Sequence, residues 1–335
     1  MATLAGTTLT YGVTSAGGNR EDLADRIYDL FPDDTYFLTN LQKTSASATL
    51  HEWLGDTLVA AGSNINIEGN DGSFSSIQSP SRYANYTQIF KKEFIISDTQ
   101  EKVAKAGRRT EGARQSVKQM RELKNDVEWA LVRNQTASAG SATTGRVLGS
   151  MEAWIGAGRT ASATVATSHV LATAGSGATT AAISSKVPGA VTDASTGSAG
   201  AITSAALDYA LQGAWAQGGT TDIIAVSAGV KATINGFTSI VVRNVDVGRR
   251  DQAVITGAAD LYTSSFGVHR LLLHRHVRTN VALCLDTSLW AVSSLRDFFM
   301  ERLAKTGDGH KYSLRYEGTL ECRNYLGNSK VSSIG

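Results

Sequence analysis

The sequence reads KYSLRYEGTLECR from Lys311 to Arg323, and apolar or small residues alternate there with polar ones without interruption. Side chains of a β-strand point alternately to opposite faces, so this period of two predicts one strand that is covered on one side. The strand would be about 43 Å long at the usual rise per residue. Few compact enzymes need such a strand, and we expect an element of similar length to cover its apolar face.

The composition is that of a folded protein with many turns. The chain has 335 residues, of which 42% are hydrophobic and 19% are charged, with 33 glycines and 3 prolines. This length allows one large or two modest domains, and this apolar content supports a real core. The formal net charge of +2 argues against a protein whose whole surface binds a polyanion, although a local basic face is allowed.

The cysteine usage and the N-terminus bear on the cellular compartment. Cys284 and Cys322 each lie on the apolar face of an expected strand, and no CxxC spacing is present, so we expect two buried, reduced thiols. The sequence has no basic and apolar N-terminal signal and no apolar run long enough to span a membrane. We therefore expect a soluble protein that is made inside the cell.

A long hairpin is expected in the first third of the chain. Residues 49–58 and 83–96 are rich in aromatic and aliphatic side chains and predict two strands, whereas residues 60–82 are rich in Gly, Ser and Asn. The tip has too few apolar residues to pack on its own domain. Loops of this kind are usually functional or disordered.

Residues 97–134 predict one long helix. Ser97 and Asp98 can cap it, and its length would be roughly 55 Å if it is continuous, which suits the strand at 311–323 as a partner. Gly107 and Gly112 weaken its first half by about 1 kcal/mol each. Its apolar stripe comprises Ala113, Val117, Met120, Leu123, Val127 and Leu131.

This helix also carries a basic stripe, formed by Arg114, Lys118 and Arg121, away from its apolar stripe. One interpretation is a surface that contacts phosphates of DNA without reading sequence. The other interpretation, which we favour, is a solvated face with ion pairs along the helix, such as Lys118 with Glu122, or with ion pairs between subunits.

The rest of the chain predicts an arm, short helices and short strands. Residues 1–18 predict an uncharged arm, followed by a short helix from Asn19 to Pro32. Residues 156–202 are dominated by Ala, Ser, Thr and Gly and predict a surface insertion with no core of its own. Residues 207–247 predict a helix, a strand at 222–228, a helix at 230–237 and a strand at 240–247. A hairpin at 261–277 and a strand at 281–285 follow.

The sequence contains no complete catalytic or metal-binding motif. His274 and His276, with His269 nearby, suggest a partial metal site, but no acid or Cys at close spacing completes it. A basic strand surface with Arg270, Arg275 and Arg278 is the better interpretation. The sequence has no zinc-protease, nucleophile-elbow, Rossmann or phosphate-loop motif, so we expect no enzyme, no cofactor and no metal.

Several blocks of this sequence resemble a known family. The most specific are LRDF at 295–298, LAKTGD at 303–308 and YEGTLECRN at 316–324, and looser ones lie at 20–38, 51–58, 149–155 and 260–267. They resemble major capsid proteins of tailed double-stranded DNA bacteriophages with the Hong Kong 97 (HK97) fold. The resemblance covers nearly all of the chain except 156–202.

The resemblance implies an α+β fold of the HK97 type, with an N-terminal arm, an E-loop, a peripheral domain built on a long spine helix, and an axial domain. In these terms residues 1–47 are the arm, 48–96 the E-loop hairpin and 97–139 the spine helix. Residues 140–258 are the axial domain with its insertion, and 259–335 return through both domains.

The implied function is self-assembly as hexamers and pentamers into an icosahedral shell around the genome, in the host cytoplasm and then in the virion. The implied partners are copies of the chain, the portal, a scaffolding protein, possible decoration proteins and packaged DNA, with no membrane. Some members of the fold crosslink a loop-tip Lys to an Asn of the next subunit. Residues 60–82 contain no Lys, so we expect a noncovalent shell. The alternatives are a β-rich adhesin-like surface protein and, more remotely, an enzyme with an unrecognised site.

Overall fold

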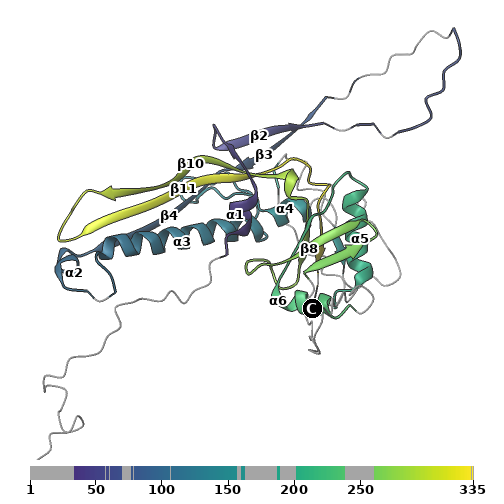
Figure 1. The fold of residues 1–335 in the computed structure, drawn as a ribbon. Coiled ribbons are helices and arrows are strands. Elements are labelled where there is room, and N and C mark those ends of the chain that lie inside the picture. Colours follow the sequence, from purple (N-terminus) through teal and green to yellow (C-terminus); the bar gives the residue numbers. More distant parts are fainter. Residues whose placement is uncertain are drawn as a thin grey trace, which may run out of the picture.

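The computed structural model describes residues 34–56, 58–59, 61–69, 77, 79–105, 107–156, 160–162, 187–188, 201–237, 260–332 and 334. An elongated layer of helix and sheet lies beside a second α/β part, and a hairpin projects from the junction between them (Figure 1). The helix expected at 19–32, the strand expected at 240–247 and most of the insertion at 156–202 lie outside the described residues.

The elongated part is built on a four-stranded sheet in the order β1-β10-β11-β4. The strands are β1 (Gln42–Ser45), β4 (Gln88–Ile96), β10 (Trp290–Leu303) and β11 (His310–Cys322). The strand expected at 311–323 is thus confirmed as β11, one residue earlier than the sequence pattern placed it. It pairs antiparallel with β10 on one side and β4 on the other, so it lies inside the sheet.

Both faces of β11 are covered, and the expectation that only one would be was wrong. Leu314, Tyr316 and Leu320 are buried in the main core, as the alternation predicts. On the other face Glu317 is also buried, because Arg146 and Arg296 reach its carboxylate at 2.6 and 2.7 Å. The alternation of residue types shows which face of the strand a side chain lies on. It does not show whether ion pairs bury the side chains of the polar face.

The single helix expected at 97–134 is two helices, α2 (Asp98–Lys102) and α3 (Glu111–Val132). The Ser97 side chain accepts a hydrogen bond from the Gln100 amide, so the expected cap is confirmed. The chain leaves the helix at Val103, which is extended, and passes Gly107 with φ of +72°, a conformation that glycine tolerates best. The continuous α3 is about 33 Å long, shorter than expected.

The apolar stripe is confirmed only in the second half of α3. Leu123, Val127 and Leu131 are buried against the sheet. Val117 is 57% exposed, and Ala113 is exposed as well. The reason is that Gly112 faces the Tyr312 hydroxyl, so the start of the helix turns Gly112, and not Ala113, toward the sheet.

The hairpin consists of β2 (Leu50–Gly55) and β3 (Ser81–Tyr86), paired antiparallel. The strand expected at 83–96 is therefore divided into β3 and β4. The division falls at Thr87, a buried residue whose amide donates to the Thr49 carbonyl at 2.9 Å. This turn lets β4 stay in the long sheet while β2 and β3 leave it (Figure 1).

The second part is a six-stranded sheet in the order β5-β12-β9-β6-β8-β7. Its strands are β5 (Thr160–Ser162), β6 (Ile223–Val226), β7 (Leu261–Ser264), β8 (Gly267–Leu273), β9 (Ala282–Leu285) and β12 (Ser329–Ser332). Helices α5 (Ser204–Trp215) and α6 (Ala228–Asn235) contribute to its core. The expected helices and the buried strand β6 are confirmed, and Trp215 at the end of α5 is exposed. Residues 160–162 of the expected insertion form an edge strand of this sheet.

Three short elements join the parts: α1 (Tyr36–Asn40), α4 (Met151–Gly156) and the 3-10 helix η2 (Thr287–Leu289). Cys284 and Cys322 are buried and unpaired, as expected. Burial raises the pKa of Cys284 to about 12 and that of Cys322 well above its usual value. Within the described residues, no helix combines the length and apolarity needed to cross a bilayer.

Candidate assembly surfaces

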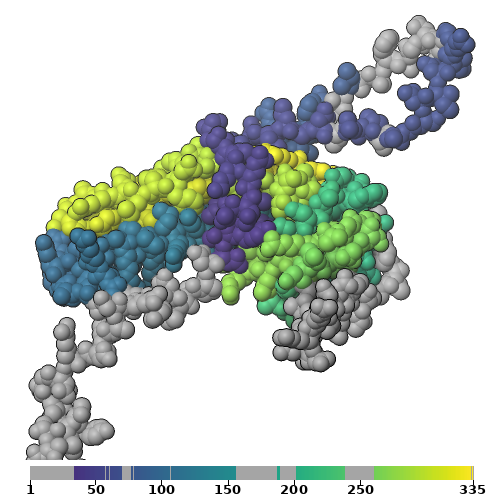
Figure 2. Space-filling model, in the orientation of Figure 1, coloured from purple at the N-terminus to yellow at the C-terminus, as the bar shows by residue number. Residues whose placement is uncertain are grey.

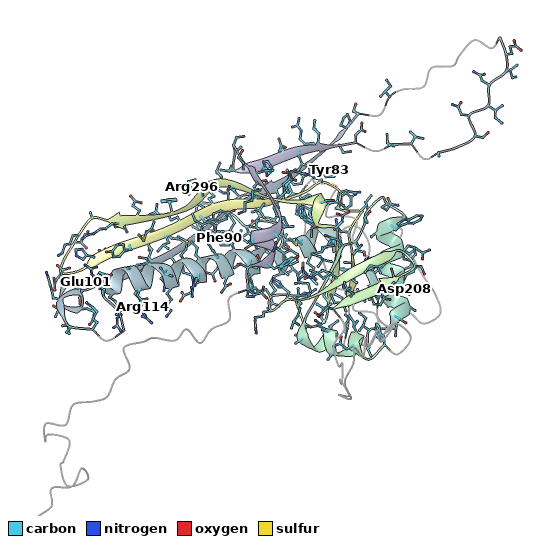
Figure 3. All side chains as sticks on the ribbon, in the orientation of Figure 1. Tyr83, Phe90, Glu101, Arg114, Asp208 and Arg296 are labelled. Atoms are coloured by element: carbon cyan, nitrogen blue, oxygen red, sulfur yellow. The ribbon has the colours of Figure 1, made fainter. Side chains whose placement is uncertain are left out.

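The base of the hairpin is firmly attached to the body. The Trp53 indole donates to the Cys322 carbonyl at 2.9 Å and lies 5.5 Å from the Trp154 ring. Tyr83 contacts the rings of Trp154 and Tyr325, with centroids 6.5 and 5.8 Å away (Figure 3). Aromatic contacts of this kind hold both strands of the hairpin at one angle to the sheet.

Asn85 adds a polar anchor at the same place. Its side chain is fully buried, donates to the carbonyls of Gly149 and Leu320 at 2.9 and 2.8 Å, and accepts from the Gly149 amide at 2.8 Å. A buried amide with its hydrogen bonds satisfied specifies one geometry. The hairpin therefore leaves the body in a defined direction.

The outer part of the hairpin carries apolar side chains that nothing in the described chain covers. Leu58 is 99% exposed and Ile77 is 96% exposed. Val59, Ile65 and Ile67 are also largely exposed. In the space-filling view this segment stands clear of the body (Figure 2). Exposed apolar groups gathered on one projection are typical of a surface that another protein covers.

Lys91 and Lys92 lie in β4, outside the hairpin tip, as expected. Lys91 pairs with Glu93 at 2.6 Å, and Lys92 pairs with Asp126 of α3 at 2.9 Å. Both amines are thus bound to carboxylates on the sheet and helix of their own subunit.

The three predicted basic residues lie on α3. Figure 3 shows the labelled Arg114 on the side of this helix that is turned away from the long sheet. Arg114 lies 3.5 Å from Glu111, and Lys118 lies 3.8 Å from Glu122. A hydrogen bond from Gln115, and then the nearby Arg108, hold the pKa of Glu111 below its usual value. The intrahelical pairs of the favoured interpretation are present, while contacts with DNA or with another subunit remain predictions.

A buried carboxylate at Glu128 joins three parts of the chain. It accepts hydrogen bonds from the amides of Phe37 and Leu38 in α1, both at 2.7 Å, and from His274 Nε2 at 2.9 Å. Asp34 lies 3.7 Å from the same imidazole nitrogen. Three segments therefore meet at this one carboxylate: helix α3, the segment that leads in from the N-terminus, and the loop after β8.

His274 and His276 do not form the suggested metal site. Strand β8 ends at Leu273, so both lie in the following loop, with ring centroids 5.5 Å apart. The His276 amide donates to His274 Nδ1 at 3.2 Å, which places the proton of His274 on Nε2, facing Glu128. His269 lies elsewhere, bonded to Ser264 and to the Thr221 carbonyl. The described residues include no cluster of metal ligands.

The expected basic surface around β8 is only partly present. Arg275 is exposed, and Arg270 lies over the Tyr36 ring. Arg278 instead pairs with the buried Glu152 of α4. Lys330 of β12, also fully buried, reaches Glu152 at 3.2 Å. The charged Glu152 inside the apolar run MEAWI is a sequence signal for this group, whereas Lys330 lies in a mostly polar run and gives none.

His276 lies beside His274 at the same junction. Burial, and then the nearby His274, lower the pKa of His276, and its Nε2 has no hydrogen-bond partner among the described residues. The nearby carboxylates of Asp34 and Glu128 raise the pKa of His276, whereas Arg133, like His274, lowers it. A histidine with a depressed pKa contributes its full stability above its unfolded pKa, near pH 6.5, and loses that contribution as the pH falls.

We therefore expect His276→Gln to reduce the fall in Tm between pH 7.5 and pH 5.5 by about 1–2 °C, because the group is only partly buried. Thermal unfolding at the two pH values measures this. His310→Gln, at the far end of the sheet, serves as the control and should keep the original acid sensitivity. An unchanged pH dependence in His276→Gln would show that another group controls it.

Solved structures with the same architecture are phage-type capsids. The capsid of cyanophage A-1(L) matches with a TM-score of 0.66 and 13% identity, over 97% of this chain and 99% of that chain. The capsid of a native GTA particle matches with a TM-score of 0.61 and 11% identity, over 98% and 100%. A structure from Gordonia phage Cozz matches with a TM-score of 0.58 and 13% identity, over 98% and 96%. At these identities the likeness establishes the fold, which is the α+β capsid fold of the HK97 type.

The sequence then identifies the family within that class. The chain belongs to the family of SU10 major capsid proteins, whose model matches residues 4–334. The major capsid protein of Escherichia phage Phieco32 is 32% identical over 119 residues, which are 35% of this chain. The matched region spans 34% of that relative's length. The family resemblance expected from 295–324 is confirmed.

Proposed function

We propose that this chain is a structural protein that self-assembles, as hexamers and pentamers, into the icosahedral head that encloses a phage's double-stranded DNA. The single observation that carries this proposal is the family match across residues 4–334. The division into an arm (1–47), an E-loop (48–96), a peripheral and an axial domain is part of the proposal, with α3 alone as the continuous spine helix.

The geometry of the hairpin supports this function. Its base is fixed by Trp53, Tyr83 and Asn85, while its tip exposes Leu58, Ile77 and their apolar neighbours. A rigid base with an uncovered apolar tip suits a loop that lies on the next subunit. Many weak contacts of this kind, repeated around each capsomer, sum to a stable shell.

The shell is proposed to be noncovalent. No Lys is present in residues 60–82. The nearest candidates, Lys91 and Lys92, bind carboxylates of their own subunit at 2.6 and 2.9 Å. An amine held in this way is not positioned to attack an Asn of a neighbouring subunit.

The remaining partners follow from the proposed role. They are a portal at one vertex, a scaffolding protein during assembly, decoration proteins where present, and the packaged genome. The protein would assemble in the host cytoplasm, reside in the virion shell and have no catalytic activity, cofactor or membrane partner.

The test is to express the chain alone and with its scaffolding protein and to view the products by electron microscopy. Shells, rings or capsomers are expected. Uniform small particles under every salt condition would overturn the proposal and favour an enzyme. Extended fibres on a cell surface would favour the adhesin-like alternative.

The same shells can be used to test whether their subunits are covalently crosslinked. Purified particles that are boiled in SDS should yield a single band of 35.4 kDa, the mass of one chain. Lys91→Arg with Lys92→Arg should leave this pattern unchanged. A ladder of higher bands that disappears in the double variant would contradict a noncovalent shell.

A further inference from the structure

Two arginines share one carboxylate on the polar face of β11. Arg146 Nη2 lies 2.6 Å from Glu317 Oε1, and Arg296 Nε and Nη2 lie 2.8 and 2.7 Å from Glu317 Oε2. Glu317 is buried, whereas the side chains of Arg146 and Arg296 are 29% and 45% exposed. One carboxylate cannot neutralise two guanidinium groups, so this group of three residues, the arginine clamp, presents excess positive charge to solvent.

The clamp keeps hydrogen-bond donors that its own contacts do not use. Arg146 Nε donates to the Thr87 carbonyl at 3.3 Å, but within the described part of the chain nothing reaches Nη1 of either arginine. The register of β10 against β11 shifts on both sides of Arg296, and such irregularities re-aim a side chain out of a regular sheet. Figure 3 shows the labelled Arg296 on the side of the long sheet away from α3. Guanidinium groups presented in this way suit a second carboxylate.

The outer part of the hairpin carries the complementary charge. Residues 56–81 contain three acids, Asp56, Glu68 and Asp71, and no Lys, Arg or His. Asp56 already has an interaction, and Asp71 lies outside the described residues. Glu68 is exposed and forms no ion pair with the rest of the described chain. Glu68 is therefore the acid that we assign to the clamp.

The acid must come from a second copy of the chain. The hairpin stands clear of its own body in the space-filling view, and Trp53, Tyr83 and Asn85 fix its base (Figure 2). Its tip therefore does not fold back onto the clamp of its own subunit. The surroundings match as well, because Ile89 of β4 lies opposite Glu317 and is about half exposed, and Ile67 beside Glu68 is largely exposed.

We propose that Glu68 of one copy binds between Arg146 and Arg296 of a neighbouring copy. This contact rests on the proposed function, since it needs two copies side by side, and it names the residues that would fix the position of the hairpin. Apolar contacts of the tip are non-directional, whereas a carboxylate held by two guanidinium groups has one defined position. The clamp would thus set the register of the hairpin on its neighbour.

Crosslinking in assembled shells tests this contact. A short bifunctional maleimide should join Glu68→Cys to Ile89→Cys between chains, because the two native thiols are buried. Glu68→Cys with Ile95→Cys is the matched control, since Ile95 is exposed on the same face of β4, roughly 20 Å from Ile89. Shells in which the first pair crosslinks no more than the control, or only within one chain, would overturn the contact alone. If the unmodified chain forms no shells, the proposed function fails and the contact fails with it.

Removal of the charge gives a second readout. Glu68→Gln should raise the subunit concentration needed for assembly by about tenfold at low salt, because each copy loses one charge-assisted contact. The difference should largely disappear at about 1 M salt, where exposed charges are screened. Glu52→Gln is the control, since Glu52 pairs with Arg82 of its own hairpin at 3.6 Å, and it should assemble like the unmodified chain. Normal assembly of Glu68→Gln, or a defect that persists at high salt, would show that the clamp does not bind Glu68.

Discussion

Replacing Glu128 with Leu is expected to lower the free energy of unfolding by about 3–5 kcal/mol, a large part of a typical domain's stability. The carboxylate of Glu128 is fully buried and accepts from the amides of Phe37 and Leu38 and from His274. Leucine fills a similar volume but leaves these three donors without their acceptor, and each buried unsatisfied donor carries a desolvation penalty. Chemical denaturation of unassembled subunits measures the loss.

Glu122→Leu is the matched control. Glu122 lies on the same helix but pairs only at the surface, with Lys118 at 3.8 Å and Lys92 at 3.9 Å. Its replacement should change stability by less than about 0.5 kcal/mol. Hydrogen exchange should locate the effect of Glu128→Leu at the Phe37 and Leu38 amides. Equal stabilities for the two variants would mean that the network at Glu128 does not hold the junction together.

Ile65→Asp combined with Ile67→Asp is expected to abolish shell formation without unfolding the subunit. Both side chains are largely exposed, so their replacement removes no packing within the chain. If a neighbouring subunit covers them, each copy loses roughly 1.5–3 kcal/mol per isoleucine and must also bury a carboxylate. The effect is repeated at every copy in the shell. Electron microscopy and sedimentation should show free subunits or capsomers in place of particles.

The control for this pair is Ser63→Asp, which adds a charge to the same loop while keeping its apolar groups. It should assemble normally. Thermal unfolding of the isolated subunits should agree among the two variants and the unmodified chain. Normal particles from the double variant would show that the hairpin tip is not an assembly contact.

Much of the fold was predictable because it depends on local periodicity. The alternation at 311–323 predicted β11 to within one residue, and the cap at Ser97 predicted where α2 begins. The family was predictable from 295–324, where the motifs are dense. The hairpin base was found as well, because Trp53 and Tyr83 lie in clearly strand-like runs.

The predictions that were wrong concern positions whose structure depends on tertiary packing. The apolar stripe predicted Val117 to be buried, but the orientation of α3 is set by Gly112 facing Tyr312 from β11. The break between α2 and α3 begins at the extended Val103 and includes Gly107 in a left-handed conformation, which the sequence marked as weakening but not as a turn. Local propensity could not decide either outcome, because packing on the sheet overrides it.

The sequence alone determined the class of fold, the long strand, the projecting hairpin and the family, since each depends on residues close together in the chain. Only the tertiary structure revealed that the polar face of β11 is buried and that Glu128 and Glu152 join its parts. The partners of these carboxylates, Phe37 and Lys330, are 91 and 178 residues away. Periodicity reports which face a side chain occupies, whereas the burial of a charge depends on partners that only folding brings within hydrogen-bond distance.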